Sequence, residues 1–473
     1  MKVKARYLLG FLLICSLTCS AIFKVTKIKD SLVDSTALTI NGDFGQAING
    51  KSYQQDAIVT HKNFQYVGYY DGQRHVCLAR RRLPAGKWEV IRFRDYQFKS
   101  NDAHNTISIG ICPGDGTIHM AFDHHVHPLH YRVSQKGTAT DPEKVVWNES
   151  LFSPVASELE KGKPISVTYP RFLQTPNGGL QFFYRRGVSG EGDRMMVDYD
   201  YKAGTWINTR QIDSGKGLFV DAMGKSESRC TYPNGYSYGP DGRLHTTWVW
   251  REDSQGSNHD LVYVFSNDQG KTWLNNSGEL LSEPANVNSP GTTVVKIGRE
   301  YGLMNTHGQA IDRKGGVHTV MWHCTDESLK KAGSKPGVER WGPPEARSYH
   351  HYRRDEKGEW HHNELPWIAG NRQKLFIDRK NNVFLIYCAQ VHIPEGGTTP
   401  EFANGDLVIA AASAKSGWND WKIIHREAGP FVNEMLGDPT RWKEEEILSI
   451  MVQESPQKVN DPTPLRILDF SFH

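Results

Sequence analysis

The chain has 473 residues, of which 38% are hydrophobic and 23% are charged. Its 56 lysines and arginines nearly balance its 53 aspartates and glutamates, so the formal net charge at pH 7 is only +3. A near-neutral chain has no general attraction for polyanions, which excludes nucleic acid as the expected partner and requires a local cluster of cations for any anionic ligand.

The first 21 residues differ from the rest and are typical of a secretory signal. Three cations precede the apolar run of residues 7–14, which is too short to span a bilayer as a stable anchor. Cys19 is an alternative lipoprotein cysteine, but Thr18 before it departs from the usual small residue, so we favour ordinary cleavage. Cleavage removes three positive charges and no negative ones, which leaves a neutral mature protein. We expect this protein to be secreted or periplasmic, with residues 22–473 as one domain and no membrane span.

Six hairpin signals follow in chain order. Each is a turn rich in glycine, asparagine or aspartate that precedes a short apolar or alternating run. A tryptophan recurs after each hairpin, at spacings of 59, 59, 67, 87 and 58 residues: Trp88, Trp147, Trp206, Trp273, Trp360 and Trp418. This period predicts radially repeated four-stranded sheets.

Residues 266–273 read S-x-D-x-G-x-T-W, the Asp-box found on propeller blades of sialidase-like proteins. The Asp268 carboxylate is suited to accept backbone N–H bonds in a tight turn. Gly270 supplies a backbone angle that other residues resist, and Trp273 is expected to pack beneath the turn as a plug.

A seventh blade is predicted from the two ends of the chain. Residues 447–452 and 465–470 form two of its strands, and an N-terminal strand such as residues 36–40 completes it. Closing the ring with both ends protects the last edge strand. No segment has the pattern of a long amphipathic helix, so the predicted fold class is all-β, a seven-bladed β-propeller.

The hairpin register predicts one central cleft. In each blade the start of the first strand and the end of the second lie side by side on one face of the disc. Counting outward from each turn places His104 opposite His124 and His125, Tyr169 opposite Arg185, and Tyr232 opposite Arg251, and the third strand of the fourth blade adds His259. A single histidine or tyrosine at a strand end is usually structural, but consecutive blades repeating the choice favour a functional cleft.

Histidine, tyrosine and arginine without a facing pair of carboxylates favour β-elimination over glycoside hydrolysis, which usually needs two acids. Elimination requires a base for the proton alpha to a uronate carboxylate, an acid for the leaving oxygen, and a cation for the charge that develops. Tyrosine can serve as base and acid when an adjacent cation lowers its pKa from about 10. Arg185 is the natural bidentate partner of the carboxylate.

Several runs of sequence make the chain resemble the propeller-fold ulvan lyases, which are secreted bacterial enzymes that cleave a sulfated algal polysaccharide. These runs are Phe122-Asp-His-His125, Tyr169-Pro-Arg-Phe172, Tyr184-Arg-Arg-Gly-Val-Ser-Gly190 and Trp248-Val-Trp-Arg-Glu252, and the likeness extends from about Asn41 to the C-terminus. The resemblance implies cleavage of an anionic rhamnose–uronate polymer, with Tyr169 as catalytic base and acid. It also implies that His104 and His124 assist, that Arg185 neutralises the uronate, and that Tyr232, Arg251, His259 and His125 contact the substrate.

Two other functions remain open. The Asp-box is shared with sialidases, but the Arg-Ile-Pro-type motif expected near the N-terminus is missing, and no aspartate is well placed as the acid. A non-catalytic carbohydrate-binding propeller would need aromatic platforms but no base beside an arginine. The Tyr169–Arg185 pair argues against that alternative.

A structural zinc site is predicted in the fifth blade, although elimination itself requires no cofactor. His307 begins the first strand, His323 and Cys324 end the second, and His350 begins the third, so all four can converge at one rim. Imidazole and thiolate suit zinc, which usually takes four ligands in structural sites. The competing interpretation is a buried free cysteine beside surface histidines. We expect a monomer.

Overall fold

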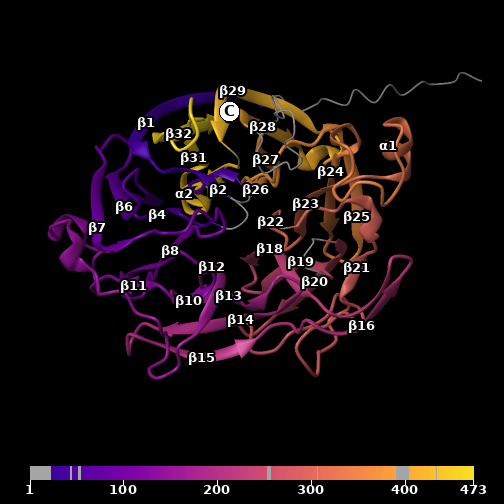
Figure 1. The fold of residues 1–473 in the computed structure, drawn as a ribbon, viewed down its shortest axis with the longest axis horizontal. Coiled ribbons are helices and arrows are strands. Elements are labelled where there is room, and N and C mark those ends of the chain that lie inside the picture. Colours follow the sequence, from indigo (N-terminus) through magenta and orange to yellow (C-terminus); the bar gives the residue numbers. More distant parts are fainter. Residues whose placement is uncertain are drawn as a thin grey trace, which may run out of the picture.

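The repeating unit of the fold is an antiparallel sheet in which successive strands are neighbours. The computed structural model describes residues 23–42, 45–51, 55–252, 257–305, 307–389, 404–432 and 434–473. Seven such sheets surround a common centre, which confirms the predicted seven-bladed β-propeller (Figure 1). The predicted signal segment lies outside the described residues.

The first four blades occupy residues 58–295. Blade one contains β4 (Ile58–His61), β5 (Phe64–Tyr70), β6 (His75–Arg82) and β7 (Glu89–Gln97). Blade two contains β8 (Ile107–Ile111), β9 (Ile118–Phe122) and β11 (Tyr131–Val133). Blade three contains β12 (Ser166–Gln174), β13 (Leu180–Val188), β14 (Glu191–Asp200) and β15 (Thr205–Gln211), with β10 (His125–Pro128) added beside β12. Blade four contains β18 (Cys230–Tyr238), β19 (Leu244–Arg251), β20 (Asn258–Ser266) and β21 (Thr293–Val295).

The remaining blades complete the ring. Blade five contains β22 (Gly308–Ile311), β23 (Val317–His323), β24 (Ser348–Arg354) and β25 (Trp360–Ile368). Blade six contains β26 (Lys374–Ile377), β27 (Val383–Cys388), β28 (Asn404–Ala412) and β29 (Lys422–Val432). Blade seven contains β30 (Leu436–Gly437), β31 (Ile447–Gln453), β32 (Thr463–Phe472) and β1 (Val25–Ala37). Two small hairpins, β2 (Thr39–Gly42) with β3 (Gly45–Ala47) and β16 (Lys216–Asp221) with β17 (Gly224–Ser228), lie outside the blades.

The core lies between the blades. All seven residues of β5 and all seven of β23 are buried, because each blade is covered on both faces by its neighbours. A typical cluster packs Phe183 and Met196 of blade three against Trp248 and Trp250 of blade four. Burying apolar and aromatic surface on both faces explains why the inner strands are hydrophobic throughout rather than alternating.

The ring closes through the two ends of the chain, as predicted, but the N-terminal strand lies earlier than expected. Strand β1 pairs antiparallel with β32, from Val25 opposite Phe472 to Ala37 opposite Thr463. The predicted strand at residues 36–40 instead leaves blade seven after Ala37. The backbone N–H of Leu38 then donates to the carbonyl of Tyr70 in blade one, 2.9 Å away.

Helix is confined to short segments of the described chain. Its α-helices are α1 (Asp326–Lys331), in the long insertion of blade five, and α2 (Pro439–Glu445), between β30 and β31. No helix among the described residues is long and apolar enough to cross a bilayer.

The Asp-box has the predicted structure. The Asp268 carboxylate accepts backbone N–H bonds from Lys271 and Thr272 at 3.0 and 2.9 Å, and it accepts hydroxyl bonds from Ser266 and Thr272. Gly270 has a φ of +83°, in the region that favours glycine. The Trp273 side chain is buried with the core residues shared by blades three and four. The turn is therefore fixed to the core by its own sequence.

Replacing Asp268 with alanine is expected to destabilise the propeller by about 1–3 kcal/mol, since it leaves several donors of the turn without an acceptor. Chemical denaturation should show a lower midpoint with an unchanged slope. Asp268→Asn, which keeps one acceptor oxygen, should lose less. Equal midpoints for wild type and Asp268→Ala would show that the turn adds nothing to stability.

Candidate active site

The predicted cleft residues other than His259 meet where blades two, three and four approach the centre of the ring. Figure 1 shows β8, β12 and β18 next to one another there. The ring centroid of Tyr169 lies 6.0 Å from that of His104, 6.1 Å from that of His125 and 5.9 Å from that of Tyr232. One tyrosine is therefore surrounded by rings from the loop before β8, from β10 and from β18, as the hairpin register predicted.

A bulge in blade three directs Tyr169. Thr168 pairs with Arg185 across the β12–β13 ladder, and the register then shifts before Arg171 pairs with Phe183. Tyr169 lies in this shift with a φ of +55°, which is strained for a bulky residue with a β-carbon. Bulges of this kind redirect side chains next to functional sites. The bulge brings Tyr169 under Arg185, whose Cζ lies 4.9 Å from the tyrosine ring centroid.

Arg185 has unused hydrogen-bonding capacity although it is only 3% exposed. Its Nε and one terminal nitrogen are buried and have no hydrogen-bond partner among the described residues. The other terminal nitrogen lies 3.9 Å from the sulfur of Cys230. Buried guanidinium donors are costly to leave unpaired and match a carboxylate in geometry and charge. The site is therefore suited to an anionic group that approaches Tyr169.

The two cleft tyrosines differ in acidity. Burial would raise the pKa of Tyr232, but the guanidinium groups of Arg251 and Arg185 lower that pKa below its ordinary value. Burial and the neighbouring Tyr232 raise the pKa of Tyr169 well above its ordinary value, although Arg185 opposes them. The expectation that an adjacent cation leaves Tyr169 with a lowered pKa is therefore wrong, because burial outweighs the cation. Of the pair, Tyr232 ionises first.

Arg251 contacts Tyr232 in this structure. One of its terminal nitrogens donates to the Tyr232 hydroxyl oxygen at 2.8 Å, and its Cζ lies 4.7 Å from the centre of that ring. The same nitrogen is 3.4 Å from the hydroxyl of Ser189, which also lies 3.4 Å from the Tyr232 hydroxyl. The predicted substrate contact Arg251 thus belongs to the cleft, where its guanidinium lowers the pKa of Tyr232.

The histidines that flank the β8–β9 hairpin occupy two layers. His104 and His125 stack with ring centroids 4.3 Å apart beside Tyr169, and both ring Nδ1 atoms contact the carboxylate of Asp102. His124 is fully buried and accepts a bond from the backbone N–H of His130 through its Nε2, 2.7 Å away. Its pKa is well below the ordinary value because of burial and then the neighbouring His130 and His127. His124 is therefore neutral with a proton on Nδ1, and that buried donor has no partner among the described residues.

His259 does not reach the cleft. Its side chain is 1% exposed, with Nε2 2.8 Å from Glu252 and Nδ1 3.0 Å from Asp260, and the ring of Phe219 stacks on it at 4.0 Å. Burial would lower its pKa, but the hydrogen bonds to Asp260 and Glu252 raise it above the ordinary value. The predicted substrate contact is therefore corrected: the carboxylates hold His259 inside blade four, where Arg229 completes the ion-pair network.

The predicted zinc ligands lie near one another, but they are not arranged as a metal site. His323 contacts the carbonyl of Cys324 through Nδ1 and the hydroxyl of Tyr352 through Nε2, both at 2.8 Å. His350 stacks on it at 3.7 Å and contacts His362 through Nδ1. In the described part of the chain, the groups whose ligand atoms lie within 4.8 Å of one another are Asp102 with His104 and His125, and Asp355 with Glu359 and His361. The set of His307, His323, Cys324 and His350 does not fit zinc without rearrangement, so zinc there stays a prediction.

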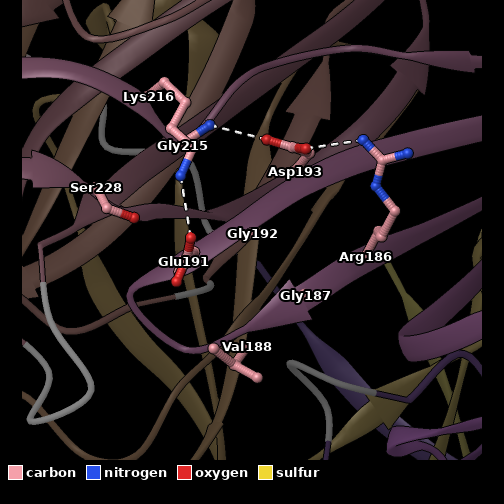
Figure 2. Close-up of a pocket in the computed structure, with 9 residues that line it drawn as sticks. All are labelled: Arg186, Gly187, Val188, Glu191, Gly192, Asp193, Gly215, Lys216 and Ser228. Atoms are coloured by element: carbon pink, nitrogen blue, oxygen red, sulfur yellow. Dashed lines mark hydrogen bonds and ion pairs between the residues drawn. The ribbon is translucent and has the colours of Figure 1, made fainter.

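A hollow of about 350 Å³ lies beside the cleft, lined by the β13–β14 hairpin and the start of β16 (Figure 2). Its cations are paired: Arg186 lies 2.9 Å from Asp193, and Lys216 lies 3.0 Å from Glu191. These contacts leave little attraction for a further anion. The hollow is therefore not the candidate active site, although Arg186 directly follows Arg185.

Sequence reasoning missed three cleft residues. Asp102 precedes His104 by two positions, and that spacing is a usable signal for a carboxylate–imidazole pair. Ser189 belongs to the quoted run that ends at Gly190 but received no role. Cys230 lies two residues before Tyr232, and its sulfur accepts from the Gly190 N–H at 3.2 Å. Nothing in the sequence placed it beside Arg185.

Fold and site define a β-propeller with a cleft of histidine, tyrosine and arginine side chains at its centre. Residues 64–367 match the model of the BNR repeat-containing family, and the chain belongs to that family.

Several relatives are known. The chain is 24% identical over 316 residues to "Ulvan lyase, long isoform" of Pseudoalteromonas sp. (strain PLSV), a match that covers 56% of this chain and 31% of that protein. It is 25% identical over 310 residues to "Ulvan lyase, short isoform" of Alteromonas sp. (strain LOR), covering 54% and 56%. The chain thus spans about a third of the length of the long relative.

Solved structures support the fold. The crystal structure of polysaccharide lyase Uly1 matches with a TM-score of 0.71 at 18% identity, covering 94% of this chain and 99% of that one. The structure of a PL25 ulvan lyase bound to -[GlcA(1-4)Rha3S]- matches with a TM-score of 0.66 at 15% identity, covering 92% and 94%. At such identities the likeness shows the shared propeller fold.

Proposed function

We propose that this protein is a polysaccharide lyase that cleaves ulvan by β-elimination at the uronate. The observation that carries the proposal is the buried Arg185 guanidinium, which has unused donors directly above Tyr169. A carboxylate receptor beside a proton-transfer group is what elimination on a uronate needs. The names of the relatives supply the substrate class, a sulfated rhamnose–uronate polymer.

The proposed reaction assigns each role to a cleft residue. Arg185 binds the uronate carboxylate, so that negative charge can spread onto it as the alpha C–H bond breaks. Tyr169 takes that proton and then protonates the leaving glycosidic oxygen as the C–O bond breaks and a C=C bond forms. The buried Nδ1–H of His124 is a fixed donor for a substrate oxygen, and His104 orients the substrate beside Tyr169. Every step uses side chains alone.

The different pKa values of Tyr169 and Tyr232 indicate how Tyr169 becomes a base. Tyr169 is protonated at the start, which suits its role as acid, so it must lose its proton before it can act as base. Tyr232 is a suitable acceptor, because its side chain contacts that of Tyr169 and because Arg251 and Arg185 stabilise its phenolate. We propose that Tyr232 draws the proton from Tyr169 when substrate binds.

The pH dependence tests this step. Because the active form requires ionised Tyr232, kcat/KM is expected to rise with pH and level off above the lowered pKa of Tyr232. In Tyr232→Phe the rise should move to higher pH, since Tyr169 itself must then ionise against its raised pKa. Initial rates across the pH range of stability measure both profiles. Superimposable profiles would refute the role of Tyr232.

A direct assay separates the lyase from the alternatives. Purified protein is incubated with ulvan, heparin, alginate and a sialoside, and the absorbance of the unsaturated uronate product is followed. We expect product from ulvan alone. Release of sialic acid would favour a sialidase-like hydrolase, and binding of ulvan without product would favour a carbohydrate-binding propeller. The two-acid route of a hydrolase lacks support, because Asp102 is already engaged by two histidines.

We further propose that the protein acts outside the cytoplasm, because a polymeric substrate is too large to enter the cell. We also propose that it is a monomer. Fractionation of the producing cells tests the location, and light scattering tests the oligomeric state. Elemental analysis of wild type and Cys324→Ser tests the zinc prediction.

A further inference from the structure

A single carboxylate joins the two histidines that face Tyr169. The Nδ1 of His104 lies 2.5 Å from one oxygen of Asp102, and the Nδ1 of His125 lies 2.6 Å from the other. The two rings are nearly parallel, with planes 22° apart. The side chains of His104, Asp102 and His125 are 10%, 23% and 25% exposed, so the group forms one wall of the cleft rather than part of the core.

The charge state of Asp102 fixes the hydrogens of both rings. Burial would raise its pKa, but the hydrogen bonds from His104 and His125 hold the pKa of Asp102 well below its usual range. An ionised carboxylate only accepts hydrogen bonds, so each Nδ1 must carry a proton. In a neutral imidazole the other nitrogen, Nε2, then keeps its lone pair.

We propose that Asp102 is a positioning residue for elimination, because it holds His104 and His125 in the Nδ1–H form, with both Nε2 atoms as the basic nitrogens of the cleft wall beside Tyr169. This inference rests on the proposed function and adds two roles to it. Asp102 acts through the imidazoles without touching substrate. His125 becomes the partner of His104, sharing its carboxylate and stacking against it, rather than one more substrate contact.

The contacts argue against a metal in the same place. Metal-bound nitrogen and oxygen atoms lie about 2.0–2.2 Å from a central ion such as zinc, and both Nδ1 atoms would have to lose their protons to bind it. Here each Nδ1 instead lies within direct hydrogen-bond distance of its own carboxylate oxygen. The geometry of Asp102, His104 and His125 is that of two carboxylate–imidazole pairs with a common acceptor.

Asp102→Asn is a selective test. The asparagine oxygen can still accept the backbone N–H of His104, which lies 2.9 Å from the present carboxylate, so the local turn survives. The other oxygen becomes an NH2 donor, which cannot face a protonated Nδ1. One of the two imidazoles must therefore switch its proton to Nε2.

Nitrogen–proton correlation NMR spectra of the histidine rings show which ring nitrogen carries the proton, and they need no substrate. His104→Gln and His125→Gln assign the signals. Wild type should show both rings as Nδ1–H, and Asp102→Asn should show at least one as Nε2–H. Two unchanged Nδ1–H rings in Asp102→Asn would overturn the proposal. This outcome is independent of lyase activity, so failure of the proposed function is distinguishable from failure of the positioning role.

Kinetics on ulvan supply the second readout. Carboxylates that orient metal-bound histidines typically contribute about 10–100-fold, and we expect a loss of that order in the kcat of Asp102→Asn with little change in KM. Asp355→Asn is the matched control, because Asp355 makes a similar 2.8 Å contact with His361 on the exposed β24–β25 hairpin; its kcat should equal that of wild type. A loss confined to KM would contradict a positioning role. So would stoichiometric bound metal that is present in wild type and lost in Asp102→Asn.

Discussion

Tyr169→Phe is expected to lower the kcat on ulvan by about two to four decades, because proton transfer by a placed acid or base is worth that much and Tyr169 performs both transfers. The ring itself is retained, so the contacts with Arg185, His104 and Tyr232 remain. The propeller should therefore stay folded, with an unchanged midpoint in thermal unfolding. Initial rates of unsaturated product measure the loss.

Tyr184→Phe is the matched control for Tyr169→Phe. Tyr184 lies one residue before Arg185 on β13, but its ring is buried in the core cluster of blades two and three. Removing its hydroxyl should leave kcat close to wild type. Loss of general acid–base catalysis should leave far less than about a tenth of the wild-type rate. If Tyr169→Phe keeps more than about a tenth of that rate, the role proposed for Tyr169 is wrong.

Much of the fold was predictable from the sequence because its signals are local. Each hairpin turn marks its own strands, and the recurring tryptophans give the repeat length, so blade number and blade order follow without long-range information. The closing strand was misplaced because its partner is remote: β1 pairs with β32, at the other end of the chain. Nothing within residues 25–37 shows which distant edge they will cover.

The site was predictable only to the level of strand ends. Counting outward from turns brought Tyr169, Arg185 and His104 together, although the bulge at Tyr169 shifts the β12–β13 register by one residue. In blade four a bulge between Pro233 and Gly235 shifts the register, so that Tyr232 pairs with Val249 rather than facing Arg251. Arg251 still reaches Tyr232 because its side chain is long. His259 does not reach the cleft, because the carboxylates of Glu252 and Asp260 hold it inside blade four.

Acidity was the least predictable property. The sequence showed a cation next to Tyr169 and suggested a lowered pKa, but the sign depends on how much of the ring is buried. Only the assembled cleft shows that the cations act mainly on Tyr232 and that burial dominates at Tyr169. Asp102 was missed for a related reason, since its importance comes from two histidines that lie 21 residues apart in the chain.

Arg185→Ala is expected to lower kcat/KM on ulvan by about 10²–10³-fold, the usual cost of removing one donor that stabilises developing charge. Arg185→Lys should recover part of this loss, because it restores the charge but not the two-pronged geometry. Arg186→Ala is the neighbouring control: Arg186 is 54% exposed and paired with Asp193, so its removal should leave the rate close to wild type.

The stability of Arg185→Ala should not fall with its activity. A buried guanidinium with unpaired donors costs desolvation free energy, so the thermal midpoint of Arg185→Ala should equal or exceed that of wild type. An Arg185→Ala variant that loses both activity and stability would show that Arg185 supports the fold and would remove the main support for a carboxylate site beside Tyr169.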